Sequence, residues 1–177
     1  MSNDQTALFA VTVIGHDGPG IIARTTAGLA ELGLNIEDST MTLLRGHFAM
    51  MLLCRGEVGV AEVEAALAHV AATGGLDVAV RTVSDEPDPT ADGTSWVLTV
   101  HGGDRSGLVS EVVGQIAAAG GNITDLTTRL AGDLYLLIAE LDLPADADTS
   151  AVAQAIADAA ARVGVRATLR PTEADEL

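Results

Sequence analysis

Two short stretches of the chain combine an aspartate with glycines at the same spacing. We call them the first loop, Asp17, Gly18, Pro19, Gly20 and Ile21, and the second loop, Asp104, Arg105, Ser106, Gly107 and Leu108. Glycines let a backbone turn sharply off a strand and approach a ligand closely, and a helix that follows presents unpaired N–H groups. Such a helix start attracts a carboxylate or a phosphate. The alternative is that Asp17 and Asp104 only cap helices.

An asparagine follows each loop at the same distance. The pairs are Asn35 with Ile36, and Asn122 with Ile123. Each stands where a helix is expected to end and a strand to begin. A side-chain amide offers both a donor and an acceptor, which suits the two ends of an amino acid. The alternative is that Asn35 and Asn122 form a helix C-cap or a turn.

The two loops belong to one unit that occurs twice, at an offset of 87 residues. When residues 11–54 are set over residues 98–141 without a gap, 12 of the 44 positions are identical. Many mismatches exchange one apolar residue for another, as at Ile21 and Leu108. The chain is therefore a duplication, and each copy is long enough to bury a small core.

The elements that must position these residues follow from local patterns. Residues 19–33 have apolar side chains near helical spacing, with Pro19 at the start and Gly33 at the end. Arg45 and Gly46 divide two β-rich stretches as a hairpin turn would. The predicted elements of the first copy are strand 7–15, helix 19–33, strands 35–44 and 47–55, helix 60–73 and strand 76–83. Those of the second copy are strand 96–102, helix 106–121, strands 122–130 and 134–143, helix 149–163 and strand 165–169.

This order predicts an α/β (α+β) chain of two tandem ferredoxin-like βαββαβ sandwiches with antiparallel sheets. We expect domains at residues 1–84 and 95–172. Residues 85–94 are rich in proline and acids and are expected to form a linker, and residues 173–177 a polar tail.

Composition excludes several classes of function. The net charge of −16 opposes direct binding to nucleic acid, and four aromatic residues give no platform for stacking bases. No apolar run is long enough to cross a bilayer, so we expect a soluble, cytoplasmic protein with no membrane partner.

No residue pattern indicates catalysis, a metal or a cofactor. The single cysteine, Cys54, is expected to be a buried strand residue without redox chemistry. The histidines show no spacing typical of metal ligands. Arg24 and Glu111 are expected on the solvated faces of the first helices.

The tandem pattern of Asp-x-x-Gly and Gly-x-Asn-Ile resembles the ACT domain, and the two-copy chain resembles the glycine cleavage system transcriptional repressor family. The resemblance covers residues 7–169. It implies βαββαβ folding, amino-acid binding where domains meet, and a regulatory output. It also implies that both loops bind ligand, with Asn35, Ile36, Asn122 and Ile123 contributing from across an interface.

The Arg-Pro-Gly form of the loop that is common in this family is split between the copies. The first loop has Pro19 without the arginine, and the second has Arg105 without the proline. We therefore expect one loop to carry the stronger site. The ligand carboxylate would meet N–H groups at a helix start, and its ammonium group would meet Asp17 or Asp104 and an asparagine carbonyl. Glycine, serine and branched-chain amino acids all fit this scheme.

The function expected is that of a non-enzymatic amino-acid sensor that modulates a partner regulatory protein. One alternative is an interaction module without ligand. Another is an acyl-phosphate hydrolase, in which Arg105 would hold phosphate beside Asn122. Since the sheets have edge strands and a face without helices, we expect association and a homo-oligomer. The two units could join their sheets side by side within one chain, or two chains could pair.

Overall fold

The computed structural model describes residues 6–85 and 93–172, and the chain divides into two compact units, Met1–Glu86 and Pro87–Leu177. The first unit consists of β1 (Ala7–His16), α1 (Ile21–Glu31), β2 (Asn35–Leu44), β3 (His47–Gly56), α2 (Val60–Gly74) and β4 (Asp77–Val83). The second consists of β5 (Thr94–Gly103), α3 (Leu108–Ala118), β6 (Asn122–Ala131), β7 (Leu134–Leu143), α4 (Thr149–Arg162) and β8 (Val165–Pro171). Residues 86–92 of the expected linker and the whole expected tail lie outside the described residues.

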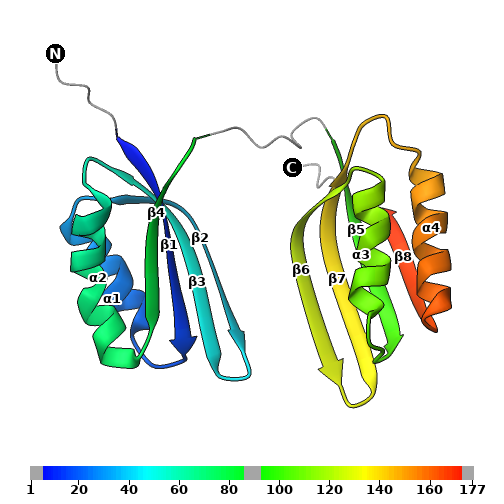
Figure 1. Ribbon diagram of the computed structural model, residues 1–177, viewed down its shortest axis with the longest axis horizontal. Helices are drawn as coiled ribbons and strands as arrows, with labels where there is room; N and C mark the ends of the chain where they lie inside the picture. The colour runs from blue at the N-terminus through cyan, green and yellow to red at the C-terminus, as the bar shows by residue number, and fades with distance from the viewer. Residues whose placement is uncertain (1–5, 86–92, 173–177) are drawn as a thin grey trace. The chain divides into compact units, whose positions relative to one another are not determined.

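Each unit has one antiparallel sheet, with strand order β2-β3-β1-β4 in the first and β6-β7-β5-β8 in the second. In each unit both helices cover the same face of the sheet (Figure 1). The predicted fold class, two βαββαβ sandwiches, is confirmed. Among the described residues, no helix combines the length and apolar composition that crossing a bilayer requires.

A separate apolar core lies between sheet and helices in each unit. Alternate residues of β1, such as Phe9 and Val11, face the helices, because side chains along a strand point to opposite faces. On α2 the buried residues Val63, Leu67 and Val70 lie on one face at helical spacing. Helix α3 presents a similar stripe to the second core.

Helices α1 and α3 are shorter than predicted. They begin two residues after the expected starts at 19 and 106, because Gly20 and Gly107 have φ of +81° and +84° and cannot continue a right-handed helix. They end at a left-handed glycine, Gly33 or Gly120, in Schellman motifs. There the residue after the glycine, Leu34 or Gly121, donates back into the helix at 3.1 or 2.9 Å. Every other predicted boundary lies within two residues of the observed one.

The sheets have two local irregularities: a tight hairpin turn between β2 and β3, and a shift of register that occurs in both units. Arg45 and Gly46 both have positive φ, 50° and 83°, and join β2 to β3 in the tight hairpin that was predicted. The register shifts between Ile36 and Asp38, and again between Ile123 and Asp125. A bulge of this kind redirects the side chains that follow it.

Candidate ligand-binding site

The glycine that precedes each helix has the same conformation in the first and second loops. Gly20 and Gly107 are the N-cap residues of α1 and α3, both are left-handed, and neither helix receives a side-chain cap. Asp17 and Asp104 therefore do not cap these helices, which was the alternative considered for them. Because the first N–H groups of a helix have no partner within it, these starts can accept an anion.

Asp17 and Asp104 are held by their backbones and expose their side chains. The N–H of Asp17 donates to the carbonyl of Gly46 at 2.9 Å, and that of Asp104 to the carbonyl of Asp133 at 3.3 Å. Each loop is thus tied to the hairpin turn of its own sheet. Both aspartates are exposed, and each stands three residues before the N-cap glycine of its helix.

The remaining loop residues divide between the core and the surface. The side chains of Ile21 and Leu108 are 3% and 2% exposed and belong to the cores, so only their main chains can meet a ligand. Gly18 is half-buried. Besides the two aspartates, the exposed loop residues are Pro19, Gly20, Arg105, Ser106 and Gly107.

Gly15 and Gly102, which precede the loops, serve internal packing. A Cβ on Gly15 would lie 2.7 Å from Leu76 Cδ2, and one on Gly102 would lie 2.7 Å from Val165 Cγ1. The repeat of these glycines therefore reflects close contact with the start of the last strand, and not an approach to a ligand.

Asn35 and Asn122 are exposed and are the first residues of β2 and β6. They are not helix caps, since Gly33 and Gly120 take the left-handed positions. Ile36 and Ile123 pack against the cores and are partly buried, which leaves their main chains for ligand contact.

Within one unit, the loop and the asparagine lie at opposite ends of the sheet. Asn35 pairs with Arg55, which pairs with Leu8 near the start of β1, whereas Asp17 follows His16 at its end. The strand between Leu8 and His16 spans about 27 Å. Arg105 and Asn122 are separated in the same way. One unit therefore cannot bring its loop and its asparagine to one ligand, and cannot place Arg105 beside Asn122 as the hydrolase alternative requires.

A pocket of about 450 Å³ opens beside Asn35, and its charged residues were not among the predicted site residues. It is lined by Thr6, Leu32, Gly33, Asn35, Glu37, Arg55, Gly56, Glu57 and Val58. Arg55 binds Glu37 through two bonds, Nε to Oε1 at 2.6 Å and Nη2 to Oε2 at 3.1 Å, and Nη2 also donates to Asp85 at 2.9 Å. These bonds to Glu37 and Asp85 raise the pKa of Arg55 above its ordinary value.

The second unit lacks this cluster, because Thr124 and Asp142 stand where Glu37 and Arg55 stand in the first. There Asp142 accepts a hydrogen bond from Ser95 at 2.6 Å. Arg55 could have been noticed in the sequence as a charged residue in the otherwise apolar strand β3. The two units thus differ at the asparagine end of the sheet as well as at the loops.

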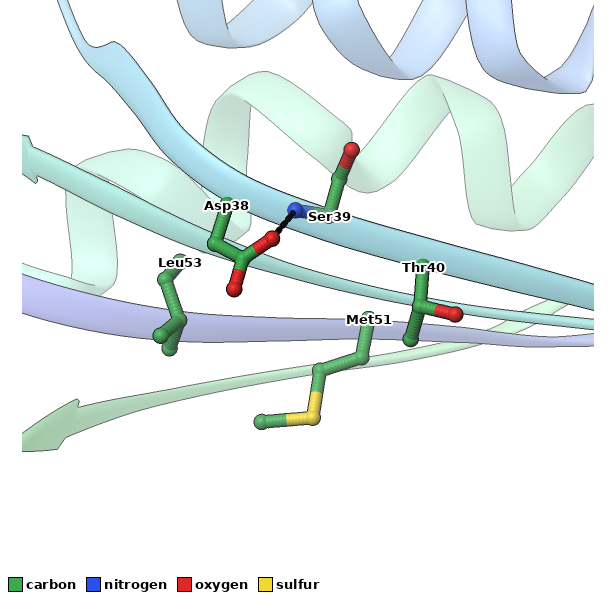
Figure 2. A pocket seen from close by; sticks show the side chains of 5 residues that line it. All are labelled: Asp38, Ser39, Thr40, Met51 and Leu53. Atoms are coloured by element: carbon green, nitrogen blue, oxygen red, sulfur yellow. Dashed lines mark hydrogen bonds between the residues drawn. The ribbon is translucent and has the colours of Figure 1, made fainter. Parts of the chain in front are cut away.

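A smaller hollow of about 180 Å³ lies on the sheet face opposite the helices. It is lined by Asp38, Ser39, Thr40, Met51 and Leu53. Figure 2 shows Asp38, Thr40, Met51 and Leu53 pointing to the helix-free side, while the Ser39 N–H donates to Asp38 Oδ1 at 2.7 Å. Its lining has a single charged side chain, which suits an apolar contact better than a polar ligand.

The structure also brings together two histidines that lie far apart in the sequence. Residues His16 and His47 pair across β1 and β3, and their rings stack with centroids 5.0 Å apart, next to the first loop. The register of the hairpin could have indicated this pair. Within residues 6–85 and 93–172 no group of three or more potential metal-binding side chains is found.

Cys54 lies on β3 with its side chain fully buried, as predicted. Burial and the nearby charge of Glu37 raise the pKa of its thiol. A buried, protonated thiol is a poor nucleophile.

Two βαββαβ units in one chain define a tandem α/β-sandwich protein. A family profile described as the ACT domain matches residues 7–81 and 94–169. The chain belongs to the ACT domain family.

Similar proteins include a transcription regulator. The glycine cleavage system transcriptional repressor of Escherichia coli is 28% identical over 153 residues, which cover 82% of this chain and 80% of that protein. A UPF0237 protein of Listeria monocytogenes is 48% identical over 44 residues, which are 25% of this chain and 49% of that protein. The chain thus spans about half the length of this Listeria relative.

A crystal structure of an unknown protein from Galdieria sulphuraria has the same fold. It matches with a TM-score of 0.81 and 27% identity, covering 95% of this chain and 99% of that one.

Proposed function

We propose that this chain is a non-enzymatic regulatory protein that binds an amino acid through its ACT domains and modulates a partner regulatory protein. The observation that carries the proposal is the uncapped, left-handed start of α1 and α3 beside an exposed aspartate, present in both units. The similarity to a transcriptional repressor supports a partner involved in transcription. The net charge of −16 favours an output through protein and not through direct contact with nucleic acid.

In the proposed mechanism, the amino-acid carboxylate accepts hydrogen bonds from the first N–H groups of α1 or α3. The ammonium group binds Asp17 or Asp104 and the side-chain carbonyl of an asparagine. Since loop and asparagine lie at opposite ends of each sheet, the asparagine comes from a second unit, of the same chain or of a homo-oligomer partner. A ligand that joins two units favours the arrangement in which both contact it, and that difference in affinity drives the response.

A second candidate function is a protein-interaction module without ligand. The edge strands β2 and β6 expose apolar side chains, with Met41 and Leu43 at 46% and 47% and Leu126 and Leu130 at 41% and 45%. Exposed apolar residues on an unpaired edge favour association with another chain.

The test is a thermal-shift screen of the full chain against the 20 amino acids, in which a ligand at 100 times its Kd adds about 2.7 kcal/mol. The double variant Asp17→Ala, Asp104→Ala is expected to abolish the shift while remaining folded. Glu64→Ala, on the exposed face of α2, controls for a lost negative charge. A full shift in the double variant would exclude the assigned site, and no shift with any amino acid would favour the interaction module.

A further inference from the structure

Arg24, in the early part of α1, folds back over the first loop. Its Nη1 donates to the carbonyl of Pro19 at 3.1 Å, and the same atom lies 2.9 Å from where a Cβ on Gly20 would stand. Gly20 thus provides both the left-handed φ and the space for the guanidinium group. This placement differs from the solvated helix face to which the sequence assigned Arg24.

The Nε of Arg24 is buried and has no hydrogen-bond partner among the described residues. Buried donors without partners are rare in folded proteins, and each one calls for an explanation. Among the described residues Arg24 also has no ion pair. The guanidinium group has five N–H donors, one of which binds the Pro19 carbonyl, and the remaining Nη donors can meet an acceptor from outside the chain.

The position of Arg24 is electrostatically unfavourable with respect to its own helix, and the carboxylate that precedes this helix start is that of Asp17. A helix N-terminus carries a partial positive charge, which repels a cation in its first turns. Helix α1 has no acidic residue in its first turn to offset this. An anion bound between the first N–H groups and the guanidinium group would be attracted by both.

In the second unit, the side chain at the equivalent helix position has the opposite charge. Glu111 stands at the position equivalent to Arg24, in the first turn of α3, and pairs with Arg162 at 3.4 Å. The N–H of Leu108 already donates to the carbonyl of Arg105 at 3.2 Å. The start of α3 is thus partly neutralised by an acidic residue in its first turn.

We propose that Arg24 is a carboxylate-binding residue of the first loop, and that it makes this loop the stronger of the two ligand sites. Together with the first N–H groups of α1 it binds the α-carboxylate of the amino-acid ligand. The inference rests on the proposed function for the identity of that ligand, but the anion-binding role of Arg24 can be tested by itself. A guanidinium group forms short, charge-assisted bonds with carboxylates, often through two donors.

The experiment is NMR of the arginine Nε–H groups in the full chain. A buried Nε–H exchanges slowly and gives an observable signal, which Arg24→Lys identifies by its loss. The probes are the 20 amino acids and succinate, which has carboxylates but no ammonium group. Saturable movement of the Arg24 signal with an amino acid is expected. Arg24→Gln should then weaken binding about tenfold or more, while the matched variant Arg81→Gln, at an exposed arginine of β4, changes the Kd by less than about threefold.

Each outcome separates the inference from the proposed function. An amino acid that binds without moving the Arg24 signal, and with an unchanged Kd in Arg24→Gln, overturns the inference and leaves the function standing. Movement with succinate but with no amino acid supports the carboxylate site and overturns the amino-acid function. A signal that responds to no probe overturns the inference. The wild-type titration carries these results even when a variant fails to fold.

Discussion

At the scale of single residues, Gly15 shows that a glycine can recur in both copies because the protein interior is closely packed around it. An alanine there would place its Cβ 2.7 Å from Leu76 Cδ2 and 3.2 Å from the Gly75 carbonyl oxygen. We expect Gly15→Ala to lower the free energy of unfolding by about 1–3 kcal/mol, because backbone atoms must move to relieve the contact. The measurement is urea unfolding followed by circular dichroism.

Gly18→Ala is the matched control for this prediction. A Cβ on Gly18 meets no atom within 4 Å, so the change in stability should stay within about 0.5 kcal/mol. Equal unfolding midpoints for the two variants would show that the end of β1 can adjust to a methyl group at position 15.

Residue types alone predicted some of these roles and missed others. Cys54 could be assigned to the core because it stands among apolar residues in a strand. The backbone roles of Asp17 and Asp104, and the turn of Arg24 toward Pro19, depend on the left-handed glycines. Proline is common at a helix start, so Pro19 alone predicts a helix that begins there. It does not indicate that Gly20 is left-handed and that the helix begins only at Ile21.

At the scale of elements, the helices α1 and α3 contain glycines in contrasting surroundings. Gly114 of α3 is exposed and a Cβ there meets nothing within 4 Å. We expect Gly114→Ala to raise the free energy of unfolding by about 0.5–1 kcal/mol, since alanine restricts the unfolded chain and favours helix. The same denaturant titration measures it.

Gly28 of α1 provides the comparison. It is buried where α1 meets α2, and a Cβ would lie 3.2 Å from Leu67 Cδ2 and 3.3 Å from the Ala66 carbonyl oxygen. Gly28→Ala should therefore lose stability in spite of its better helix propensity. A gain of stability in both variants would mean that propensity outweighs the contact between the helices.

The order of elements was predictable because strands and helices differ in the period of their apolar residues, and because the duplication shows each pattern twice. The charged cluster at Arg55 was not, because its partners Glu37 and Asp85 come from separate parts of the chain. The stacking of His16 on His47 likewise depends on the register between β1 and β3.

At the scale of the whole molecule, the two cores share no residue. The single tryptophan, Trp96, packs against the second core and so reports on the second unit alone. Leu67 is fully buried in the first core. We expect Leu67→Ala to destabilise the first unit by about 2–5 kcal/mol and to leave the Trp96 fluorescence transition unchanged.

Leu98→Ala, a fully buried change in the second core, is the matched control and should shift the fluorescence transition. Circular dichroism, which follows both units, should show two steps when Leu67 is replaced. If fluorescence and circular dichroism shift together in Leu67→Ala, the units unfold as one cooperative body.

The separation of loop and asparagine within each sheet has a consequence for how such a protein is encoded. A single unit would complete the proposed site only by meeting another copy, so its sensitivity would rise and fall with the amount of protein present. Two units in one chain can be held at an effective concentration in the millimolar range by their tether. With both units in one chain, a second unit is present at this effective concentration whatever the amount of protein.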